Sequence, residues 1–413
     1  MRRHRCKPNV RLRSWFEASN LYLYMCNSSL PSLTAGLTAL AASILLSPVA
    51  IAGTGACRPS WMPKDEPAFC PWQAEQSLPE ATAYEAVATV GRNIYVIGGY
   101  RYDVASGTTT YYDGVFRSFV KANGHLSTWL VEPAFSGARS GAGVVAVGDC
   151  LYLSGGSFST TTSLNYYDDV QSAHIGSNGK LSSWTVSPNH LNVARSNLSL
   201  IAVNTSSGTF LEAVAGVAQI GGDTVHLDTI EAARVEANCG VGRWTLANYH
   251  LKGGRSSPQA LAVWDNLVVL GGWGDLDLID VYGDVQVSTP RADGSPSPWR
   301  TSAARLPTGI YGHATMLVSS PAVPDQALLL SLGGQPSTGA YANWVSYAYV
   351  SKEPDLANAI SLWRIAPTGL LTSGRAGMGA VVVEDRVYVL GGTEPKGKYD
   401  SDVLSAQFDF GHP

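Results

Sequence analysis

Residues 143–156 read GVVAVGDCLYLSGG, and this stretch decides the fold. Residues 143–147 are small or apolar and suit a strand, Gly148-Asp149 suits a tight turn, and residues 150–154 suit a second strand that ends in Gly155-Gly156. Glycine lets backbones approach closely where a strand ends at a crowded hub. An apolar strand followed by a glycine pair recurs six times, at Gly98-Gly99, Gly155-Gly156, Gly221-Gly222, Gly271-Gly272, Gly333-Gly334 and Gly391-Gly392.

A tryptophan recurs with a similar period. The six positions are Trp72, Trp129, Trp184, Trp244, Trp299 and Trp363, spaced 55 to 64 residues apart, and the glycine pairs lie 50 to 66 residues apart. Two markers that keep one phase predict a repeat protein rather than a series of globular domains.

The rest of the second repeat predicts two more strands. Residues 170–175 alternate, Asn178-Gly179 suits a hairpin turn, and residues 181–186 with Trp184 form the fourth strand. Four strands in about 50 to 60 residues are typical of a propeller blade. We therefore expect an all-β protein, a six-bladed β-propeller in which each blade is a four-stranded antiparallel sheet.

The repeats resemble those of the kelch family: an apolar strand, Gly-Gly, a tyrosine near the next strand, and then the tryptophan. Residues 87–99, 143–156 and 380–392 match this pattern, whereas the third and fifth repeats have longer first turns around residues 204–208 and 319–326. The resemblance covers residues 71–413. It implies a kelch β-propeller similar to the exported six-bladed bacterial-type proteins, among which the N-acetylneuraminate epimerases or mutarotases are the nearest enzymes by architecture.

The last repeat predicts how the ring closes. It supplies three strands and then the chain ends, so it lacks an outer strand and its tryptophan. Trp72 precedes the first glycine pair and carries the missing marker. Residues 71–76 should therefore pair with residues 403–408 and remove an exposed sheet edge.

The first 52 residues have the features of a secretion leader. Residues 37–51 are apolar, Ala50-Ile51-Ala52 resembles a signal-peptidase site, and basic residues lie upstream. Met25 is an alternative start, and a lipid anchor at Cys57 is an alternative to cleavage. We expect a secreted or periplasmic protein without a stable membrane span after cleavage, in which a Cys/Pro-rich loop (53–70) precedes the propeller (71–413).

Cysteine use agrees with export. Four cysteines remain after the leader: Cys57, Cys70, Cys150 and Cys239. An even number in an exported chain permits two disulfides. We expect Cys57 to pair with Cys70 across a short loop, whereas Cys150 and Cys239 could form a second bridge between repeats or remain isolated buried residues.

An arginine stands before the inner strand in four repeats, 10 to 12 residues after each tryptophan: Arg139, Arg195, Arg255 and Arg375. Related kelch propellers that sense acidic peptides use arginines at this position to contact ligand carboxylates, and a guanidinium presents a planar fork to an oxyanion. These arginines are candidates for binding a carboxylate. The alternative is that they bond loop carbonyls or an Asp of a neighbouring blade.

Aromatic residues gather in the loops after the glycine pairs. Tyr100, Trp273 and Trp344 are the candidates that the structural pattern of the family does not explain, and flat aromatic faces beside polar groups suit a sugar or a peptide. Tyr112, Tyr167 and Tyr399 fit the structural tyrosines of the family.

Several classes of site and partner are disfavoured. The net charge is −4 without a basic stripe, which argues against nucleic acid. The histidines and cysteines lack metal-ligand spacing, and the acidic run at residues 275–284 lacks the final Glu of a calcium loop. We expect a monomer without a cofactor or a metal.

Two functions remain open. The first is a binding propeller without catalysis, whose loop face holds an anionic small molecule, a glycan or an acidic peptide. The second is an isomerase of an acidic sugar, resembling the N-acetylneuraminate mutarotases. That activity needs a proton-transfer group in the channel, for which Glu85 and His313 are the candidates.

Overall fold

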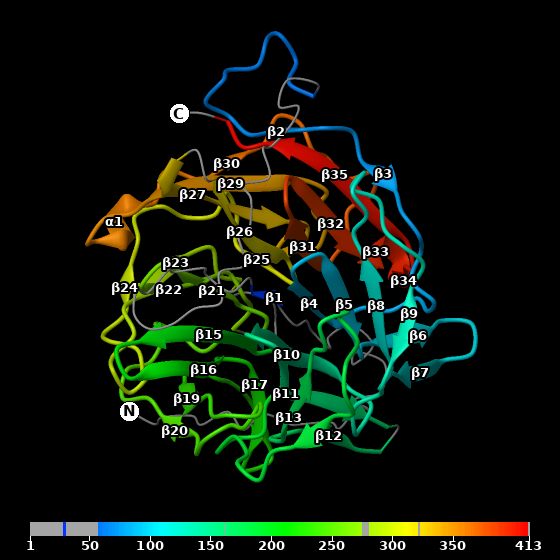
Figure 1. Cartoon of the computed structure of the whole chain (residues 1–413), viewed down its shortest axis with the longest axis vertical. Helices are drawn as coiled ribbons and strands as arrows, with labels where there is room; N and C mark the ends of the chain where they lie inside the picture. The colour runs from blue at the N-terminus through cyan, green and yellow to red at the C-terminus, as the bar shows by residue number, and fades with distance from the viewer. Residues whose placement is uncertain (1–27, 30–56, 161, 275–280, 321–322, 412–413) are drawn as a thin grey trace, which may run out of the picture.

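The computed structural model describes residues 28–29, 57–160, 162–274, 281–320 and 323–411, and shows six antiparallel sheets arranged as blades around one axis (Figure 1). The all-β six-bladed propeller expected from the repeats is confirmed. Each blade runs from an inner strand near the axis to an outer strand at the rim.

The blades are built from successive segments of the chain. From the inside outward, blade 1 consists of β4 (Ala86–Val90), β5 (Asn93–Ile97), β8 (Val115–Phe119) and β9 (Leu130–Glu132), and blade 2 consists of β10 (Ser140–Val147), β11 (Cys150–Ser159), β13 (Val170–His174) and β14 (Thr185–Val186). In the same order, blade 3 consists of β15 (Ser199–Thr205), β16 (Gly208–Val214), β19 (Ile230–Arg234) and β20 (Thr245–Leu246), and blade 4 consists of β21 (Gln259–Val263), β22 (Asn266–Leu270), β23 (Val285–Ser288) and β24 (Arg300–Thr301). Blade 5 consists of β26 (Ala314–Ser320), β27 (Val323–Leu332), β29 (Val345–Ser351) and β30 (Arg364–Ile365), and blade 6 consists of β31 (Gly379–Val383), β32 (Arg386–Leu390), β35 (Val403–Asp409) and β3 (Gln73–Ala74).

An N-terminal strand closes the ring, as predicted. Gln73 and Ala74 of β3 pair with Ser405 and Leu404 of β35. The pairing extends further than expected, because β2 (Ala68–Phe69) also pairs with the end of β35. The rim of blade 6 is therefore supplied by the first strands of the propeller, which pair with its last strand.

The third glycine pair does not end a second strand, contrary to the sequence prediction. Gly221-Gly222 forms the turn between β17 (Val217–Ile220) and β18 (Asp223–His226), a hairpin that projects from blade 3. The residues that end β16 are Ala215 and Gly216, with φ of 57° and 102°, close to the values at the other glycine pairs. With position 215 in this role, the markers lie 56 to 62 residues apart, which is more regular than the spacing of the glycine pairs.

The glycine pairs join each blade to the next. The N–H of the second residue of each pair donates to a carbonyl at the entry to the next blade, with distances of 2.9 Å or 2.8 Å. The six bonds run from Gly99 to Arg139, Gly156 to Arg195, Gly216 to Arg255, Gly272 to Ile310, Gly334 to Arg375 and Gly392 to Thr82. A Cβ at Gly99 would lie 2.2 Å from Thr82 Oγ1 and 2.9 Å from the Ala83 carbonyl oxygen, so the close approach that we inferred for this glycine is present.

Smaller elements decorate the blades. Short strand pairs follow the second strands of three blades: β6 (Tyr100–Asp103) with β7 (Thr108–Tyr111), β12 (Leu164–Tyr166) with the end of β11, and β33 (Thr393–Glu394) with β34 (Lys398–Tyr399). In blade 5, β25 (Ile310–Tyr311), which precedes the inner strand, pairs with β28 (Gln335–Pro336), which follows the second strand. Two short helices, α1 (Leu356–Ala359) and η2 (Pro395–Gly397), lie in blades 5 and 6. The two-residue strand β1 (Ser28–Ser29) pairs in parallel with Val144 and Val145 of β10. None of the helices among the described residues is long and apolar enough to cross a membrane.

Both possible disulfides are present among the described cysteines. Cys57 pairs with Cys70, as expected, and Cys150 pairs with Cys239, which settles the pairing that the sequence left open. The second bridge joins the start of β11 in blade 2 to a hairpin turn of blade 3. Apart from Ser28 and Ser29, the leader expected at residues 1–52 and its alternative start lie outside the described residues.

Candidate functional site

We call the face on which the loops after the second strands and the connections between blades emerge the loop face. The sequence placed four arginines there, each before an inner strand. The structure buries all four side chains: Arg139 is 2% exposed and Arg195, Arg255 and Arg375 are 0% exposed. They are thus interior groups of the blades rather than a ring of cations open to solvent.

Each arginine forms the same bond within its own blade. One guanidinium nitrogen donates, at 3.1 Å in all four blades, to the carbonyl of the residue that begins the glycine pair or its equivalent. These acceptors are Gly155, Ala215, Gly271 and Gly391. Because each of these residues has a positive φ, its carbonyl leaves the strand ladder and needs another donor. The arginine supplies that donor.

A carboxylate neutralises each guanidinium. Arg139 pairs with Asp169, Arg195 with Glu231, Arg255 with Asp284 and Arg375 with Asp402. Arg139 and Arg255 also lie over the rings of Tyr167 and Tyr282, with 3.6 Å and 4.0 Å between the guanidinium carbon and the ring centroid. The anion site expected at these arginines required unpaired cations that converge on one channel mouth. That expectation is not met, because each guanidinium already pairs with a carboxylate and donates to a carbonyl inside its own blade.

Glu85 and His313 occupy equivalent positions in blades 1 and 5 but do not come together. Glu85 lies between blades 1 and 6, where its Oε1 accepts the Gly379 N–H at 3.0 Å. His313 lies between blades 5 and 4, where a Cβ on Gly271 would lie 2.4 Å from its ring. Burial raises the pKa of Glu85 to about 8 and lowers the pKa of His313 to about 3. The two side chains therefore occupy different interfaces between blades, and both are 0% exposed.

Aromatic side chains form one cluster on the loop face, which we call the aromatic cluster. Its buried members are Tyr84, Tyr100, Tyr111, Trp273 and Tyr311, and its partly buried members include Tyr102, Phe158 and Tyr399. These residues come from five blades. The structure therefore brings Tyr100 and Trp273, two of the predicted site residues, into one cluster. Trp344 is separate, because it packs on the apolar core between blades 4 and 5.

Ring contacts connect the aromatic cluster. The ring centroids of Tyr100 and Tyr399 lie 5.3 Å apart in an edge-on arrangement, and those of Tyr111 and Phe158 lie 4.9 Å apart. Trp273 and Tyr311 are 5.9 Å apart. Burial raises the pKa of Tyr399 to about 12 and the pKa of Tyr100 further still, so these phenols are neutral donors and acceptors at ordinary pH. The cluster thus offers apolar faces and neutral polar edges.

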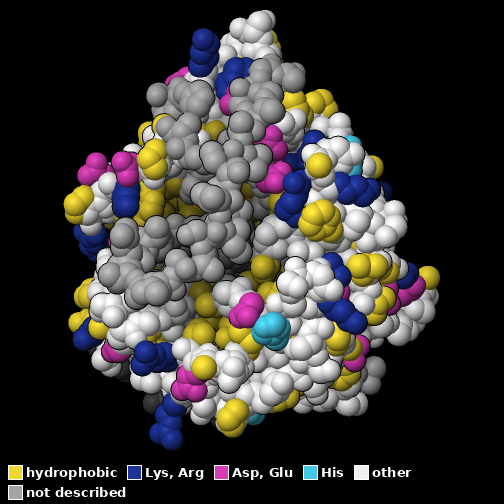
Figure 2. All heavy atoms as spheres, in the orientation of Figure 1, with side chains coloured by type: hydrophobic (Ala, Val, Ile, Leu, Met, Phe, Trp, Pro, Cys, Tyr) yellow, Lys and Arg dark blue, Asp and Glu magenta, His cyan; other side chains and the backbone are white. Residues whose placement is uncertain are grey.

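Charge is dispersed over the face shown in Figure 2. Basic and acidic side chains both occur around the part of its rim that the structure describes. No group of three or more His, Cys, Asp or Glu residues suited to a metal ion occurs among the described residues. The aspartates at residues 275–280 lie outside the described residues.

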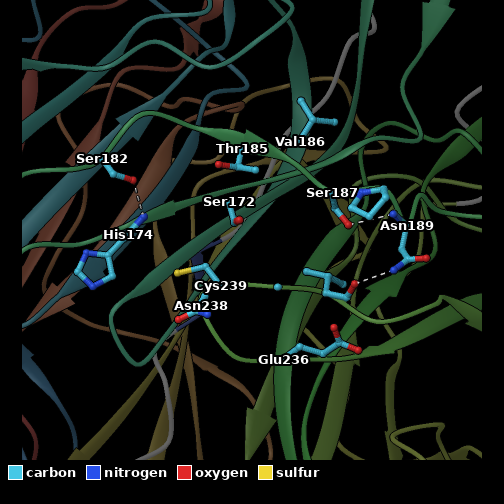
Figure 3. Close-up of a pocket in the computed structure, with 13 residues that line it drawn as sticks. Ser172, His174, Ser182, Thr185, Val186, Ser187, Asn189, Glu236, Asn238 and Cys239 are labelled. Atoms are coloured by element: carbon cyan, nitrogen blue, oxygen red, sulfur yellow. Dashed lines mark hydrogen bonds between the residues drawn. The ribbon is translucent and has the colours of Figure 1, made fainter.

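A pocket that the sequence did not predict lies at the rim between blades 2 and 3 (Figure 3). It has a volume of about 350 Å³. One wall is the outer half of blade 2, with Ser172, Thr185 and Ser187, and the opposite wall is the hairpin turn of blade 3, with Glu236 and Cys239. The pocket is formed by residues of two neighbouring blades, so no motif within a single repeat predicts it.

Comparisons with known proteins support the fold. No protein-family model matches the chain, and no curated protein matches it. A solved structure titled "Structure of YjhT" is similar with a TM-score of 0.57 and 13% sequence identity, over 81% of this chain and 99% of that chain. At this identity the likeness establishes fold alone. Together with the glycine pairs, the tryptophans and the six four-stranded blades, it identifies the fold of this chain as a kelch-type six-bladed β-propeller.

Proposed function

We propose that this protein is an exported binding propeller that holds a neutral glycan on its loop face. The aromatic cluster carries this proposal, because it brings rings from five blades to one place. Sugar rings present apolar C–H faces and polar hydroxyl edges, and tyrosine and tryptophan match both. Tyr102, Phe158 and Tyr399 are the partly exposed members that a ligand would contact first.

A neutral ligand fits the charges better than an anionic one. The four arginines at the blade entries are paired with Asp or Glu, so they add little net positive charge. The phenols are neutral because burial raises their pKa values. Binding should therefore depend weakly on ionic strength, since no new charge pair forms.

The isomerase alternative needs a proton-transfer group that can reach a ligand, and neither of its two candidates is exposed. Glu85 and His313 lie in different seams between blades and are fully buried. We therefore favour binding without catalysis. A mutarotation assay on N-acetylneuraminate, followed by proton NMR, distinguishes the two functions, because a binding protein leaves the anomer exchange rate unchanged.

A sugar panel tests the proposal. Titration calorimetry with neutral sugars and oligosaccharides, and with acidic sugars as a comparison, should give binding to a neutral member. Phe158→Ala and Tyr399→Ala should each weaken that binding by about tenfold, the equivalent of about 1.4 kcal/mol for a lost stacking partner. Trp61→Ala is the matched control, because Trp61 is 67% exposed and lies in the N-terminal loop. Binding that tolerates both substitutions in the cluster, or that is confined to acidic sugars, would contradict the proposal.

A further inference from the structure

We call the interface between two neighbouring blades a seam. In two seams, a glutamate that stands three residues after the repeat's tryptophan links the two blades. Glu75 follows Trp72 and accepts the Leu126 N–H of blade 1 at 3.0 Å. Glu132 follows Trp129 and accepts the Leu181 N–H of blade 2 at 2.8 Å. Leu126 and Leu181 are equivalent, because each forms the same isolated bridge just after its hairpin turn. The carboxylate therefore satisfies a backbone donor that the turn leaves unpaired.

The donors around Glu75 show how this carboxylate is held. Ser405 Oγ donates to Glu75 Oε1 at 2.6 Å, and His125 Nδ1 lies 3.0 Å from the same oxygen. Ser405 is the residue of the third strand that pairs with Tyr388 of the second strand. The equivalent residue in blade 2 is Ser172, because it pairs with Tyr152 in the same way.

The seam between blades 2 and 3 keeps the donors but lacks the carboxylate. Ser187 stands three residues after Trp184, where the other two seams have a glutamate. Val241 is the equivalent of Leu126 and Leu181, and the described hydrogen bonds give its N–H no acceptor. Ser172 Oγ likewise has no partner in the described part of the chain. The pocket in Figure 3 lies at this place.

In the seam between blades 3 and 4, the residue at the glutamate position matches the residue that it faces. Ala247 stands three residues after Trp244, and the residue that it faces across the seam is Pro296, the equivalent of Val241. Proline has no N–H, so blade 3 needs no acceptor there. Of these four seams, only the one at Ser187 has a donor without an acceptor in the described hydrogen bonds. The seam between blades 4 and 5 also has a serine at this position, Ser302, whose hydroxyl donates to the Ala357 carbonyl.

We propose that this pocket binds the carboxylate of a small ligand, which takes the place that Glu75 and Glu132 occupy in the other seams. The ligand carboxylate would accept the Val241 N–H and the Ser172 hydroxyl. About 350 Å³ is room for a ligand of amino-acid size. The pocket lies at the rim, apart from the aromatic cluster, so the inference does not depend on the glycan proposal.

The charges at the rim of the pocket indicate which other groups the ligand carries besides its carboxylate. Glu236 is an exposed lining residue, and Asp149 lies 2.9 Å from His174. No Lys or Arg is among the lining residues. A simple anion would be repelled by Glu236, whereas a ligand that also carries an ammonium group would gain a partner there. The favoured ligand is therefore a zwitterion such as a free α-amino acid.

Three probes and three variants test this inference. Glycine, acetate and glycinamide are titrated into the folded protein and followed by saturation-transfer NMR and by the melting temperature. Glycine should bind best, acetate more weakly, and glycinamide, which lacks the carboxylate, should not bind. Ser187→Glu places a carboxylate in the pocket as in the other seams. It should raise the melting temperature and weaken glycine binding by at least about tenfold.

Two further variants test whether a loss of glycine binding comes from the pocket itself or from a general change in the protein. Val241→Pro removes the N–H in the way that Pro296 does in blade 4, so it should abolish glycine binding in a folded protein. Ser183→Glu adds the same charge at an exposed neighbour outside the pocket and should bind glycine like the wild type. The inference is overturned if Ser187→Glu binds glycine as the wild type does or if glycinamide binds as well as glycine. It is also overturned if no probe binds the wild type, in which case the pocket is a packing defect.

Discussion

The guanidinium of Arg255 donates to both carboxylate oxygens of Asp284, at 2.8 and 3.3 Å, inside a single blade. Arg255 lies at the entry to the inner strand of blade 4, and Asp284 lies at the start of the third strand. The same guanidinium bonds the Gly271 carbonyl at the end of the second strand. One side chain therefore joins three strands where they leave the loop face.

Replacing this arginine should destabilise the fold. Arg255→Ala removes one partner of a buried pair, leaves the Asp284 charge without its cation and leaves the Gly271 carbonyl without its side-chain donor, which typically costs about 3–5 kcal/mol. Urea unfolding followed by tryptophan fluorescence measures this change. Arg300→Ala is the control, because Arg300 forms an ion pair with Asp355 in which both side chains are exposed, and such pairs contribute about 0–1 kcal/mol. Equal midpoints for the two variants would show that Arg255 is not a structural brace.

Deleting the closing segment should open the ring. Without residues 54–77, β35 loses both N-terminal partners and presents an unpaired edge to solvent. Size-exclusion chromatography should show aggregates or a larger radius, and the melting temperature should fall. Adding a synthetic peptide of residues 57–78 should restore part of the loss. A truncated protein that stays monomeric with an unchanged melting temperature would contradict this account of closure.

The fold could be predicted because similar local sequence signals recur from blade to blade. The glycine pairs, the tryptophans and the Asn-Gly turns are local signals, and they gave the blade count and the closing strand. The third repeat was misread because Ala215 takes the positive φ usually left to glycine, while Gly221-Gly222 makes an ordinary hairpin turn a few residues later. A short sequence pattern does not distinguish those two uses of glycine.

The structural role of the four arginines depends on carboxylates that lie outside the repeat motif. Their partners lie 27 to 36 residues further along the chain, at the start of the third strand. Asp169, Glu231, Asp284 and Asp402 recur in the four blades that carry the arginine. This co-occurrence was present in the sequence and indicates a brace within the blade. By contrast, the pocket between blades 2 and 3 depends on which residue faces which across a seam, and that pairing is known only from the fold.

The turn that carries Cys239 should prefer glycine once the disulfide is removed. Cys239 has φ of 59°, whereas the equivalent residues Gly124, Gly179 and Gly294 are glycines with φ of 78° to 80°. A residue with a Cβ costs about 1 kcal/mol more than glycine in this conformation. In a Cys150→Ala background, Cys239→Gly should therefore be about 1 kcal/mol more stable than Cys239→Ala. Denaturant titration under reducing conditions measures the difference, and a more stable alanine variant would show that the disulfide alone imposes the turn.

Glu212 should make the protein less stable as pH rises. It lies on β16 beside the apolar core between blades 3 and 4, is 0% exposed, and neither carboxyl oxygen has a hydrogen-bond partner among the described residues. Burial raises its pKa well above 4.5. Above pH 4.5 the folded protein therefore keeps a proton that the unfolded chain releases. Because the folded state then binds more protons, its free energy of unfolding falls as pH rises through this range.

Two substitutions at this position separate charge from polarity. Glu212→Leu removes both the titration and the buried polar group, so at pH 8 it should raise the free energy of unfolding by about 1–3 kcal/mol. The gain should be smaller at pH 4.5, where the folded carboxyl is neutral and about half of the unfolded chains also carry it protonated. Glu212→Gln removes the titration but keeps an unsatisfied amide, so it should flatten the pH dependence without the full gain. Glu85, with a pKa of about 8, contributes a slope of the same sign in every variant. Urea midpoints from pH 4.5 to 8 that run parallel for the wild type and Glu212→Leu would show that this carboxyl is not the source of the dependence.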